Sequence, residues 1–347
     1  MGDVTAPFTI AVTGAGGFIG RHTVDAAIKR GCNVAAIVRP ESSVPNDWNA
    51  SDRITVHELD LTNHQDKDKL ARVVSECKAV IHAAASLYGD DAAQRSTTLQ
   101  ANDNLLEAFS HTEAPHPALV LVSSLAVYDT YSLSENAVVT ERTPLAGSAA
   151  DRDAYCRAKL AQEEAVLRAA TQLDLQVRIM RPGAVFGSGN LWNGHIGPTA
   201  GPIAVQLAHE GEIPTCYVEH CADALVLAAT KPITQDDRTD PSGTGRVEFI
   251  NIVDDDRPTR NDFLVEMRKT GWPKIVLPGT WRALAVGGNV LKTIGLGRKA
   301  PGLLRPAVLH ARIKPLRYCN QRLHSRLSWQ ATATFEEAMR SSSAMEA

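Results

Sequence analysis

A glycine-rich turn joins a predicted strand to a predicted helix near the start of the chain. The apolar run 9–13 predicts the strand, and residues 21–30 have the apolar spacing of a helix that Gly31 can end. Between them, Gly14 permits a tight turn, Gly17 lets the backbone approach a ligand, and Gly20 allows the helix to pack closely on the strand. The pattern predicts an α/β chain that holds a dinucleotide phosphate at a helix N-terminus. A glycine-rich loop without a ligand is the alternative. The predicted contacts in this turn are Gly14, Gly16, Gly17, Phe18, Ile19 and Gly20.

The next predicted strand, residues 33–38, ends at Arg39. At this place an acidic residue would bind the ribose hydroxyls of NAD, whereas a guanidinium suits the 2′-phosphate of NADP in charge and in geometry. Ser42 and Ser43 could help to hold that phosphate. We therefore expect NADP(H), with NAD(H) as the second choice and a solvated surface arginine as the alternative to either.

A second group of residues has the chemistry of carbonyl reduction. Ser123 and Ser124 end the apolar run 118–123, and Tyr155 and Lys159 lie one turn apart on one face of a helix predicted over 153–171. Tyr155 would give a proton in reduction and accept one in oxidation, while Ser124 would donate to the substrate oxygen. Lys159 would lower the pKa of the phenol and bind the nicotinamide ribose. The predicted catalytic residues are Ser124, Tyr155 and Lys159.

These motifs resemble the extended short-chain dehydrogenase/reductase family. The matching segments are 13–20, 60–62, 82–85, 123–128, 155–159 and 181–187. The resemblance implies a Rossmann-type doubly wound parallel sheet over residues 1–187, to which 216–230 and 247–253 return, and a smaller, mainly substrate-binding lobe over 188–347. It also implies cofactor contacts at Asp60, Leu61, Ala83, Ala84, Ala85, Tyr155, Lys159, Pro182, Gly183 and Val185.

The chain departs from the family at two places. Thr98 stands where many members have an asparagine that supports the catalytic lysine, and Asn102 is nearby but out of register. No Asp-Glu pair follows Ser124, which disfavours a sugar-nucleotide dehydratase. Residues 216–224 resemble 3β-hydroxysteroid dehydrogenase-like members more than sugar-nucleotide epimerases. The glycine- and proline-rich segment 188–202 is expected to be a loop that could act as a lid.

Residues 267–335 contain thirteen Lys or Arg and no Asp or Glu, although the whole chain has a net charge of −3. This basic block could pair with acidic residues of the same chain, such as Asp236-Asp237 or 254–256. It could instead meet an anionic, apolar substrate, or lie on an anionic membrane surface. Nucleic acid is not expected, because aromatic residues do not alternate with the basic ones.

The remaining expectations concern the setting of the protein. The first residues lack a secretory signal, and the six cysteines are scattered, so we expect reduced thiols and a cytoplasmic location. The histidines lack metal-site spacing, and no metal is expected. The family resemblance implies a homodimer through the Tyr155 helix and the helix around residues 97–110.

Together the residues and the resemblance predict an NADP(H)-dependent oxidoreductase. It would interconvert a secondary alcohol and a ketone on an apolar small molecule, such as a β-keto acid or a sterol carboxylate. An NAD(P)-dependent sugar-nucleotide epimerase uses the same residues and is the first alternative. A cofactor-binding regulator without chemistry is the second.

Overall fold

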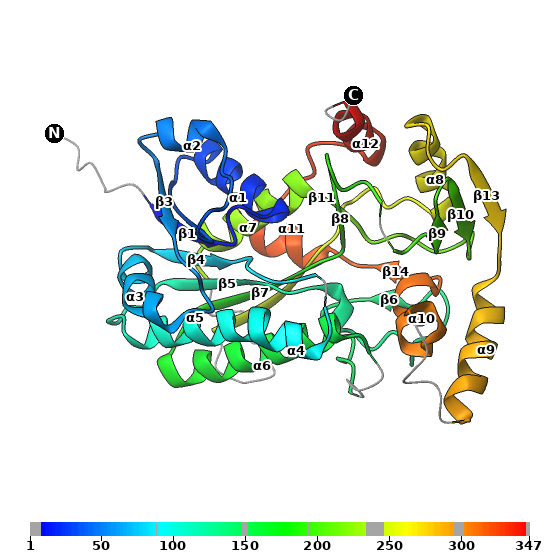
Figure 1. Cartoon of the computed structure of the whole chain (residues 1–347), viewed down its shortest axis with the longest axis horizontal. Coiled ribbons are helices and arrows are strands. Elements are labelled where there is room, and N and C mark those ends of the chain that lie inside the picture. The colour runs from blue at the N-terminus through cyan, green and yellow to red at the C-terminus, as the bar shows by residue number, and fades with distance from the viewer. Residues whose placement is uncertain are drawn as a thin grey trace.

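The computed structural model describes residues 8–87, 89–147, 152–192, 194–233, 246–294 and 302–344. Its centre is a seven-stranded parallel sheet in the order β12-β7-β5-β4-β1-β2-β3 (Figure 1). The chain reverses direction across the sheet beside β1, which places the first βα turn at a switch point where such folds bind ligands. The strands are β1 (Thr9–Thr13), β2 (Asn33–Val38), β3 (Ile54–Glu58), β4 (Ala79–His82), β5 (Ala118–Val122), β7 (Val177–Pro182) and β12 (Val247–Ile252).

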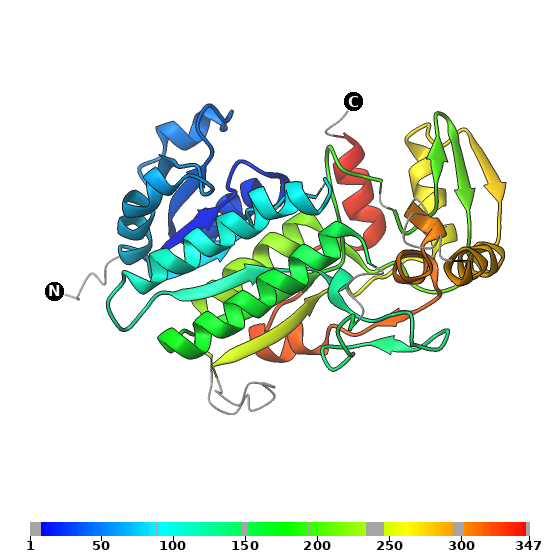
Figure 2. The ribbon, with the colours of Figure 1, turned by 60° about the horizontal axis from the view of Figure 1, so that its bottom comes forward.

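Helices cover both faces of this sheet, as the continuous apolar runs of β4 and β5 require (Figure 2). The helices α1 (Phe18–Lys29), α7 (Val218–Thr230) and α11 (Gln321–Leu327) bury apolar side chains in the core of one face. The helices α3 (Lys67–Ser75), α5 (Gln100–Ser110) and α6 (Ala154–Leu173) do so on the other. The sheet is therefore the middle of three layers, and α11 from the end of the chain belongs to the same core.

A second lobe is built mainly from the later part of the chain. It contains a three-stranded sheet with the order β13-β10-β9, and a separate apolar core that includes Phe186, Phe263 and Phe335. Two short parallel pairs, β8 with β11 and β6 with β14, lie outside the large sheet. The elements are β6 (Val138–Val139), β8 (Ala184–Phe186), β9 (Thr199–Ala200), β10 (Ile203–Gln206), β11 (Thr215–Tyr217), β13 (Ile275–Pro278), β14 (Arg317–Tyr318), α8 (Arg260–Lys269), α9 (Trp281–Thr293), α10 (Pro306–Ile313) and α12 (Phe335–Ala344), with α2 (Asn46–Ala50) and α4 (Asp91–Gln94) in the first lobe.

The predicted fold class is confirmed. The segment 188–202, predicted as a loop, contains the short strand β9, and the other predicted elements differ from the observed ones at their ends. Strands β1 and β2 have the predicted bounds, while α1 begins three residues earlier than expected and α6 runs to Leu173. Gly31 follows α1 with φ +84°, a left-handed conformation that glycine adopts without a Cβ penalty. The segment 216–230 contains α7, which packs against α1. The segment 247–253 contains β12, which pairs with β7. The division of the chain near residue 187 stays a prediction.

The basic block makes several ion pairs with acidic residues of the same chain. Arg282 pairs with Glu135 at 2.8 Å, and Arg317 lies 3.8 Å from Glu212. Two of the aspartates that we named pair with histidines instead: Asp254 bonds to His220 and Asp255 to His324. Asp236-Asp237 lies outside the described residues. Part of the block is thus neutralised within the chain.

Candidate active site

The glycine turn has the geometry that its sequence predicts. Gly14 has φ +66°, and a Cβ built on it would lie 2.9 Å from the backbone of Ala84. A Cβ on Gly20 would lie 2.1 Å from the carbonyl oxygen of Gly14, and the Gly17 N–H donates to that same oxygen at 2.9 Å. The turn is therefore closed by contacts between backbone atoms that leave no room for a side chain at either end.

The N-terminus of α1 is suited to an anion. Its cap residue Gly17 offers no side chain to the first-turn N–H groups, and the first turn has no acidic residue. A phosphate would satisfy those donors and match the positive end of the helix dipole. Arg21 ties this turn to the segment after β2, because its guanidinium donates to the carbonyls of Gly16 at 2.9 Å and Ser43 at 2.8 Å. The residues present fit the pyrophosphate of a dinucleotide.

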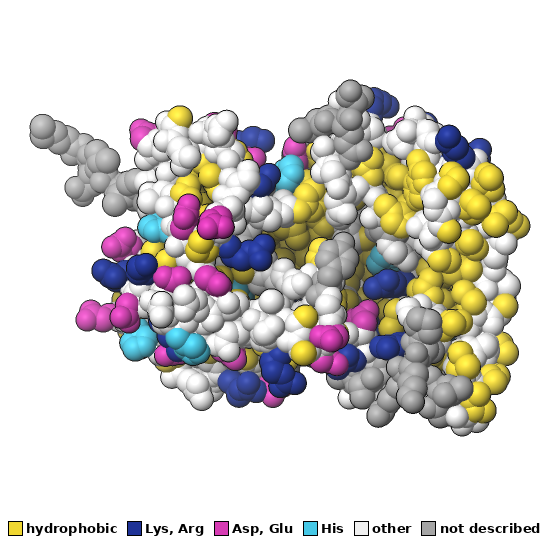
Figure 3. All heavy atoms as spheres, in the orientation of Figure 1, with side chains coloured by type: hydrophobic (Ala, Val, Ile, Leu, Met, Phe, Trp, Pro, Cys, Tyr) yellow, Lys and Arg dark blue, Asp and Glu magenta, His cyan; other side chains and the backbone are white. Residues whose placement is uncertain are grey.

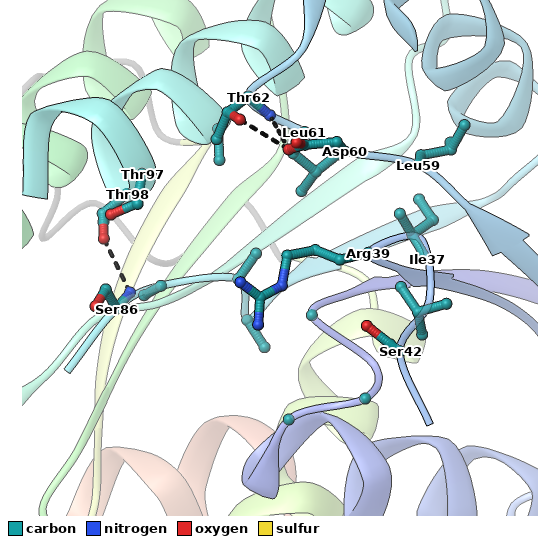
Figure 4. Close-up of a pocket in the computed structure, with 18 of the residues that line it drawn as sticks. Ile37, Arg39, Ser42, Leu59, Asp60, Leu61, Thr62, Ser86, Thr97 and Thr98 are labelled. Atoms are coloured by element: carbon teal, nitrogen blue, oxygen red, sulfur yellow. Dashed lines mark hydrogen bonds between the residues drawn. The ribbon is translucent and has the colours of Figure 1, made fainter. Parts of the chain in front are cut away.

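A cavity of about 560 Å³ opens beside this turn (Figure 4). It brings together many of the predicted cofactor residues from four loops: Gly14, Gly16, Gly17, Arg39, Asp60, Leu61, Ala83, Ala84 and Ala85. Phe18, Ile19 and Gly20 are not among its lining residues, because they belong to the first turns of α1. Other lining residues were not predicted from the sequence: Ile37, Val38, Leu59, Thr62, Ser86, Leu87, Thr97 and Ala101. Thr62 lies in the matching segment 60–62. The other residues have no motif of their own, and their position beside the motif residues was the available signal.

The Arg39 side chain extends into this cavity from the end of β2, with Ser42 close by (Figure 4). The Ser42 N–H donates to the Arg39 carbonyl at 3.1 Å, which folds the loop back beside the guanidinium. Across the cavity, Asp60 accepts hydrogen bonds from the Thr62 N–H at 2.9 Å and the Thr62 hydroxyl at 2.8 Å. The cavity is therefore lined by the Arg39 cation and by the Asp60 carboxylate. Hydrogen bonds from Thr62 in the same loop hold that carboxylate in place.

The candidate catalytic side chains come from two neighbouring elements. Asp153 caps α6 by accepting from the Cys156 N–H at 2.9 Å, so Tyr155 lies in the first turn. Lys159 is 3% exposed, and its ammonium donates to the Val122 carbonyl at 2.8 Å and lies 5.9 Å from the centre of the Tyr155 ring. Ser124 follows β5 and caps a short 3₁₀ turn at 125–127. The serine, tyrosine and lysine thus meet near the carboxyl end of β5.

Burial is the largest influence on the ionisation of Tyr155 and Lys159. Burial raises the pKa of Tyr155 to about 12, and its hydrogen bond with Ser124 only partly opposes this. Burial lowers the pKa of Lys159 to about 8, against the attraction of Glu163. Burial outweighs any effect of Lys159 on the phenol in this arrangement, because the ammonium faces the Val122 carbonyl. The role of Lys159 in stabilising the phenolate stays a prediction. The phenol retains its proton at neutral pH.

A buried polar network that was not predicted from the sequence lies behind the catalytic group. Glu163, one turn after Lys159 on α6, accepts from the Ser123 hydroxyl at 2.5 Å and forms a two-point ion pair with Arg181 of β7. Arg181 also donates to the Tyr128 hydroxyl at 2.9 Å, and that hydroxyl donates to Asn251 of β12 at 2.7 Å. The spacing of Tyr155, Lys159 and Glu163 at every fourth residue was the signal that could have revealed the glutamate.

Pro182 ends β7, and Gly183 and Val185 follow it at the β7–β8 junction. A Cβ on Gly183 would lie 2.0 Å from the Pro214 carbonyl oxygen, so this position needs glycine for packing against the second lobe. None of the three lines the 560 Å³ cavity. They share the carboxyl edge of the sheet with Ser124, because both strands run in the same direction.

A sequence profile of the NAD dependent epimerase/dehydratase family matches residues 10–240, which is most of the chain. The chain belongs to this family. With its relatives, the match identifies an NAD(P)-dependent extended short-chain dehydrogenase/reductase, as the motifs predicted.

Curated members of the family show how varied its reactions are. The chain is 28% identical over 245 residues to a sterol-4-alpha-carboxylate 3-dehydrogenase (decarboxylating) from Candida albicans, covering 68% of each chain. It is 27% identical over 187 residues to cinnamoyl-CoA reductase 2 from Medicago truncatula, covering 52% of this chain and 54% of the relative. It is 25% identical over 261 residues to GDP-mannose 3,5-epimerase 1 from rice (Oryza sativa subsp. indica), covering 70% and 65%. The matches thus span from about half to two thirds of each relative.

Solved structures of UDP-glucose 4-epimerases share the whole fold. A UDP-glucose 4-epimerase from Stenotrophomonas maltophila with bound NAD superposes with a TM-score of 0.70 at 18% identity, covering 98% of this chain and 99% of that one. The Thermus thermophilus UDP-glucose 4-epimerase complex with NAD gives 0.65 at 18% identity, covering 97% and 98%. Both lobes of the chain therefore have the arrangement found in these structures.

Thr98, where many family members have asparagine, lies at the cofactor cavity. Its hydroxyl donates to the Gln94 side chain at 2.8 Å and accepts from the Ser86 N–H at 2.9 Å. Asn102, one turn further along, is 1% exposed. Thr98 thus holds the loop after β4 in place. Among the described residues no cluster of His, Cys, Asp or Glu could hold a metal ion.

Proposed function

We propose that the protein is an NADP(H)-dependent oxidoreductase that interconverts a secondary alcohol and a ketone on an apolar, carboxylate-bearing substrate. The observation that carries this proposal is the protonated Tyr155 phenol, hydrogen-bonded to Ser124 and adjacent to Lys159 at the carboxyl edge of the sheet. A proton donor, a second donor for the oxygen and a cation are the groups that carbonyl reduction needs from a protein.

Each residue has a defined part in this reaction. A nicotinamide cofactor, when bound, supplies the hydride in reduction and accepts it in oxidation. Tyr155 gives its proton to the carbonyl oxygen, and the Ser124 hydroxyl donates a hydrogen bond to that oxygen as negative charge develops on it. Lys159, with a pKa of about 8, carries a positive charge at neutral pH and stabilises the phenolate that remains. The carbonyl carbon gains a hydride and the oxygen a proton, which yields the alcohol.

Two further observations support the choice of cofactor and substrate. Arg39 extends into the cavity where it can pair with a 2′-phosphate, which only NADP carries. The relative from Candida albicans is named for a sterol carboxylate, a substrate of the apolar and anionic class that the basic block suggests. The alternative is a sugar-nucleotide epimerase, which the rice GDP-mannose 3,5-epimerase supports.

The test combines cofactor titration with turnover. We expect tighter binding of NADPH than of NADH, and net oxidation of NADPH at 340 nm with a β-keto acid or a keto-sterol carboxylate. Tyr155→Phe should abolish this turnover and leave NADPH affinity nearly unchanged, because the phenol hydroxyl acts on substrate. Conversion of a UDP- or GDP-sugar without net absorbance change would favour the epimerase, and full turnover by Tyr155→Phe would refute the assigned proton donor.

A further inference from the structure

The small sheet of the second lobe has an apolar outer surface. Its edge strand β13 exposes Ile275 at 48% and Leu277 at 46%, while the residue between them, Val276, packs on the core of the lobe. The neighbouring strand β10 is in register, with Ile203 beside Ile275 and Val205 beside Leu277. A sheet with one solvated face normally has polar residues on that face. Both faces of β13 are instead apolar.

Helix α9 repeats this pattern next to the sheet. Its inner side buries Trp281 and Ala285 in a small apolar cluster. Its outer side exposes Val286 at 66% and Val290 at 55%, and Ile294, just past the helix end, is 60% exposed. These three residues are four apart and form one stripe. A helix that is apolar on opposite sides is buried or faces an apolar phase.

The exposed side chains form one surface. Figure 3 shows hydrophobic side chains gathered along the edge of the molecule over β13 and α9. We call this surface the apolar face, and define it by Ile275, Leu277, Val286, Val290 and Ile294. A contiguous exposed patch of this kind marks a site of interaction with a protein or a membrane.

Charge at the border of the apolar face limits what can cover it. Lys274 directly precedes β13, and Arg268 lies at the end of α8, the helix that leads into β13; both cations are exposed. Within the described parts of the chain, neither makes an ion pair with an acidic side chain. The surrounding block 267–335 contains no Asp or Glu. Two copies meeting through this face would bring like charges together, which opposes self-association.

The residues of the apolar face also argue against a protein partner. All five are aliphatic, whereas the centres of protein interfaces are enriched in Tyr, Trp, Phe, Met and Arg. Aliphatic side chains bordered by cations match an interfacial membrane surface, where apolar groups enter the boundary of the acyl chains and cations meet the headgroups. In the part of the chain that the structure describes, none of the helices has the length and hydropathy of a membrane span.

We propose that the apolar face docks the protein on an anionic lipid bilayer. Ile275, Leu277, Val286, Val290 and Ile294 enter the interfacial region, while Lys274 and Arg268 contact anionic headgroups. This inference does not depend on the reaction that the protein catalyses.

The test is co-sedimentation of the full chain with extruded vesicles. We expect at least about tenfold more protein bound to phosphatidylcholine with about 30% phosphatidylserine than to phosphatidylcholine alone, and loss of this preference at about 1 M salt, where charges are screened. The double variant Val286→Glu/Val290→Glu should bind anionic vesicles at least about tenfold more weakly. Lys274→Glu/Arg268→Glu should lose the preference for anionic vesicles.

Val138→Glu is the matched control, because Val138 is 48% exposed on β6, outside the apolar face. It should bind vesicles like the wild type, and circular dichroism should show all variants folded. Equal binding by the wild type and Val286→Glu/Val290→Glu, or no binding to either vesicle, would overturn the proposal. Sedimentation velocity provides a further check: a concentration-dependent dimer that Val286→Glu/Val290→Glu abolishes would assign the face to a second copy of the chain instead.

Discussion

Glu163 and Arg181 form a fully buried two-point ion pair, with their side chains 2% and 3% exposed and the shortest contact at 2.6 Å. The glutamate lies one turn after Lys159 on α6 and the arginine at the end of β7, so the pair joins the catalytic helix to the sheet. Arg181 also stacks 4.8 Å from the Tyr128 ring and 4.6 Å from Phe249. Removing one member would leave the other charge buried without its partner.

We therefore predict that Glu163→Gln destabilises the protein by about 3–5 kcal/mol, measured by urea unfolding at pH 7. The neighbouring Glu164→Gln is the control, because Glu164 is 72% exposed in its pair with Arg168 and should change stability by less than about 1 kcal/mol. Similar losses for both variants would show that burial does not set the strength of the Glu163–Arg181 pair.

The rate of ketone reduction should fall as pH rises through about 8. Tyr155, with a pKa of about 12, keeps its proton throughout this range, but Lys159 loses its charge near pH 8 and then no longer stabilises the phenolate. Lys159→Arg retains a charge, so its residual activity should lack this decline. The measurement is the pH profile of kcat for both enzymes. A wild-type profile that stays level from pH 7 to 10 would contradict this role for Lys159.

Arg39→Ala should weaken NADPH binding by roughly 10- to 150-fold, the value of one charged hydrogen-bonding contact of about 1.5–3 kcal/mol. NADH lacks the 2′-phosphate, and its affinity should change little, so it provides the internal control. Fluorescence titration of wild type and variant with each cofactor gives both numbers. Equal weakening of NADH and NADPH binding would mean that Arg39 shapes the cavity and does not select the cofactor.

Gly20→Ala should destabilise the protein by roughly 1–3 kcal/mol, because the added Cβ would lie 2.1 Å from the Gly14 oxygen and 2.8 Å from the Ala15 Cα, two backbone atoms that cannot move aside as a flexible side chain can. Helix propensity alone would favour alanine by about 1 kcal/mol, so a loss isolates the steric effect. At Gly16 the nearest atom to an added Cβ is a Val38 methyl carbon at 3.7 Å. Gly16→Ala should therefore keep its stability in urea unfolding, and an equal loss there would refute the argument.

Much of the site could be predicted because its chemistry is local in the chain. The turn from Gly14 to Gly20 needs only a strand, seven residues and a helix, and Tyr155 and Lys159 share a face through helical spacing alone. The doubly wound parallel sheet was implied by the family resemblance that these motifs carry. These features gave the fold class and the family before any contact was known.

By itself, the sequence determined the phosphate turn, the catalytic helix and the cation after β2, since each depends on residues close together in the chain. Only the tertiary structure decided that Glu163 meets Arg181, that Ser86, Thr97 and Ala101 join the cofactor cavity, and that Tyr155 has a raised pKa. The tertiary structure also decided that the exposed aliphatic residues of β13 and α9 form one apolar face. The physical reason is that burial and long-range contacts depend on which strands and helices become neighbours in space. The spacing of residues along the chain does not specify those neighbours.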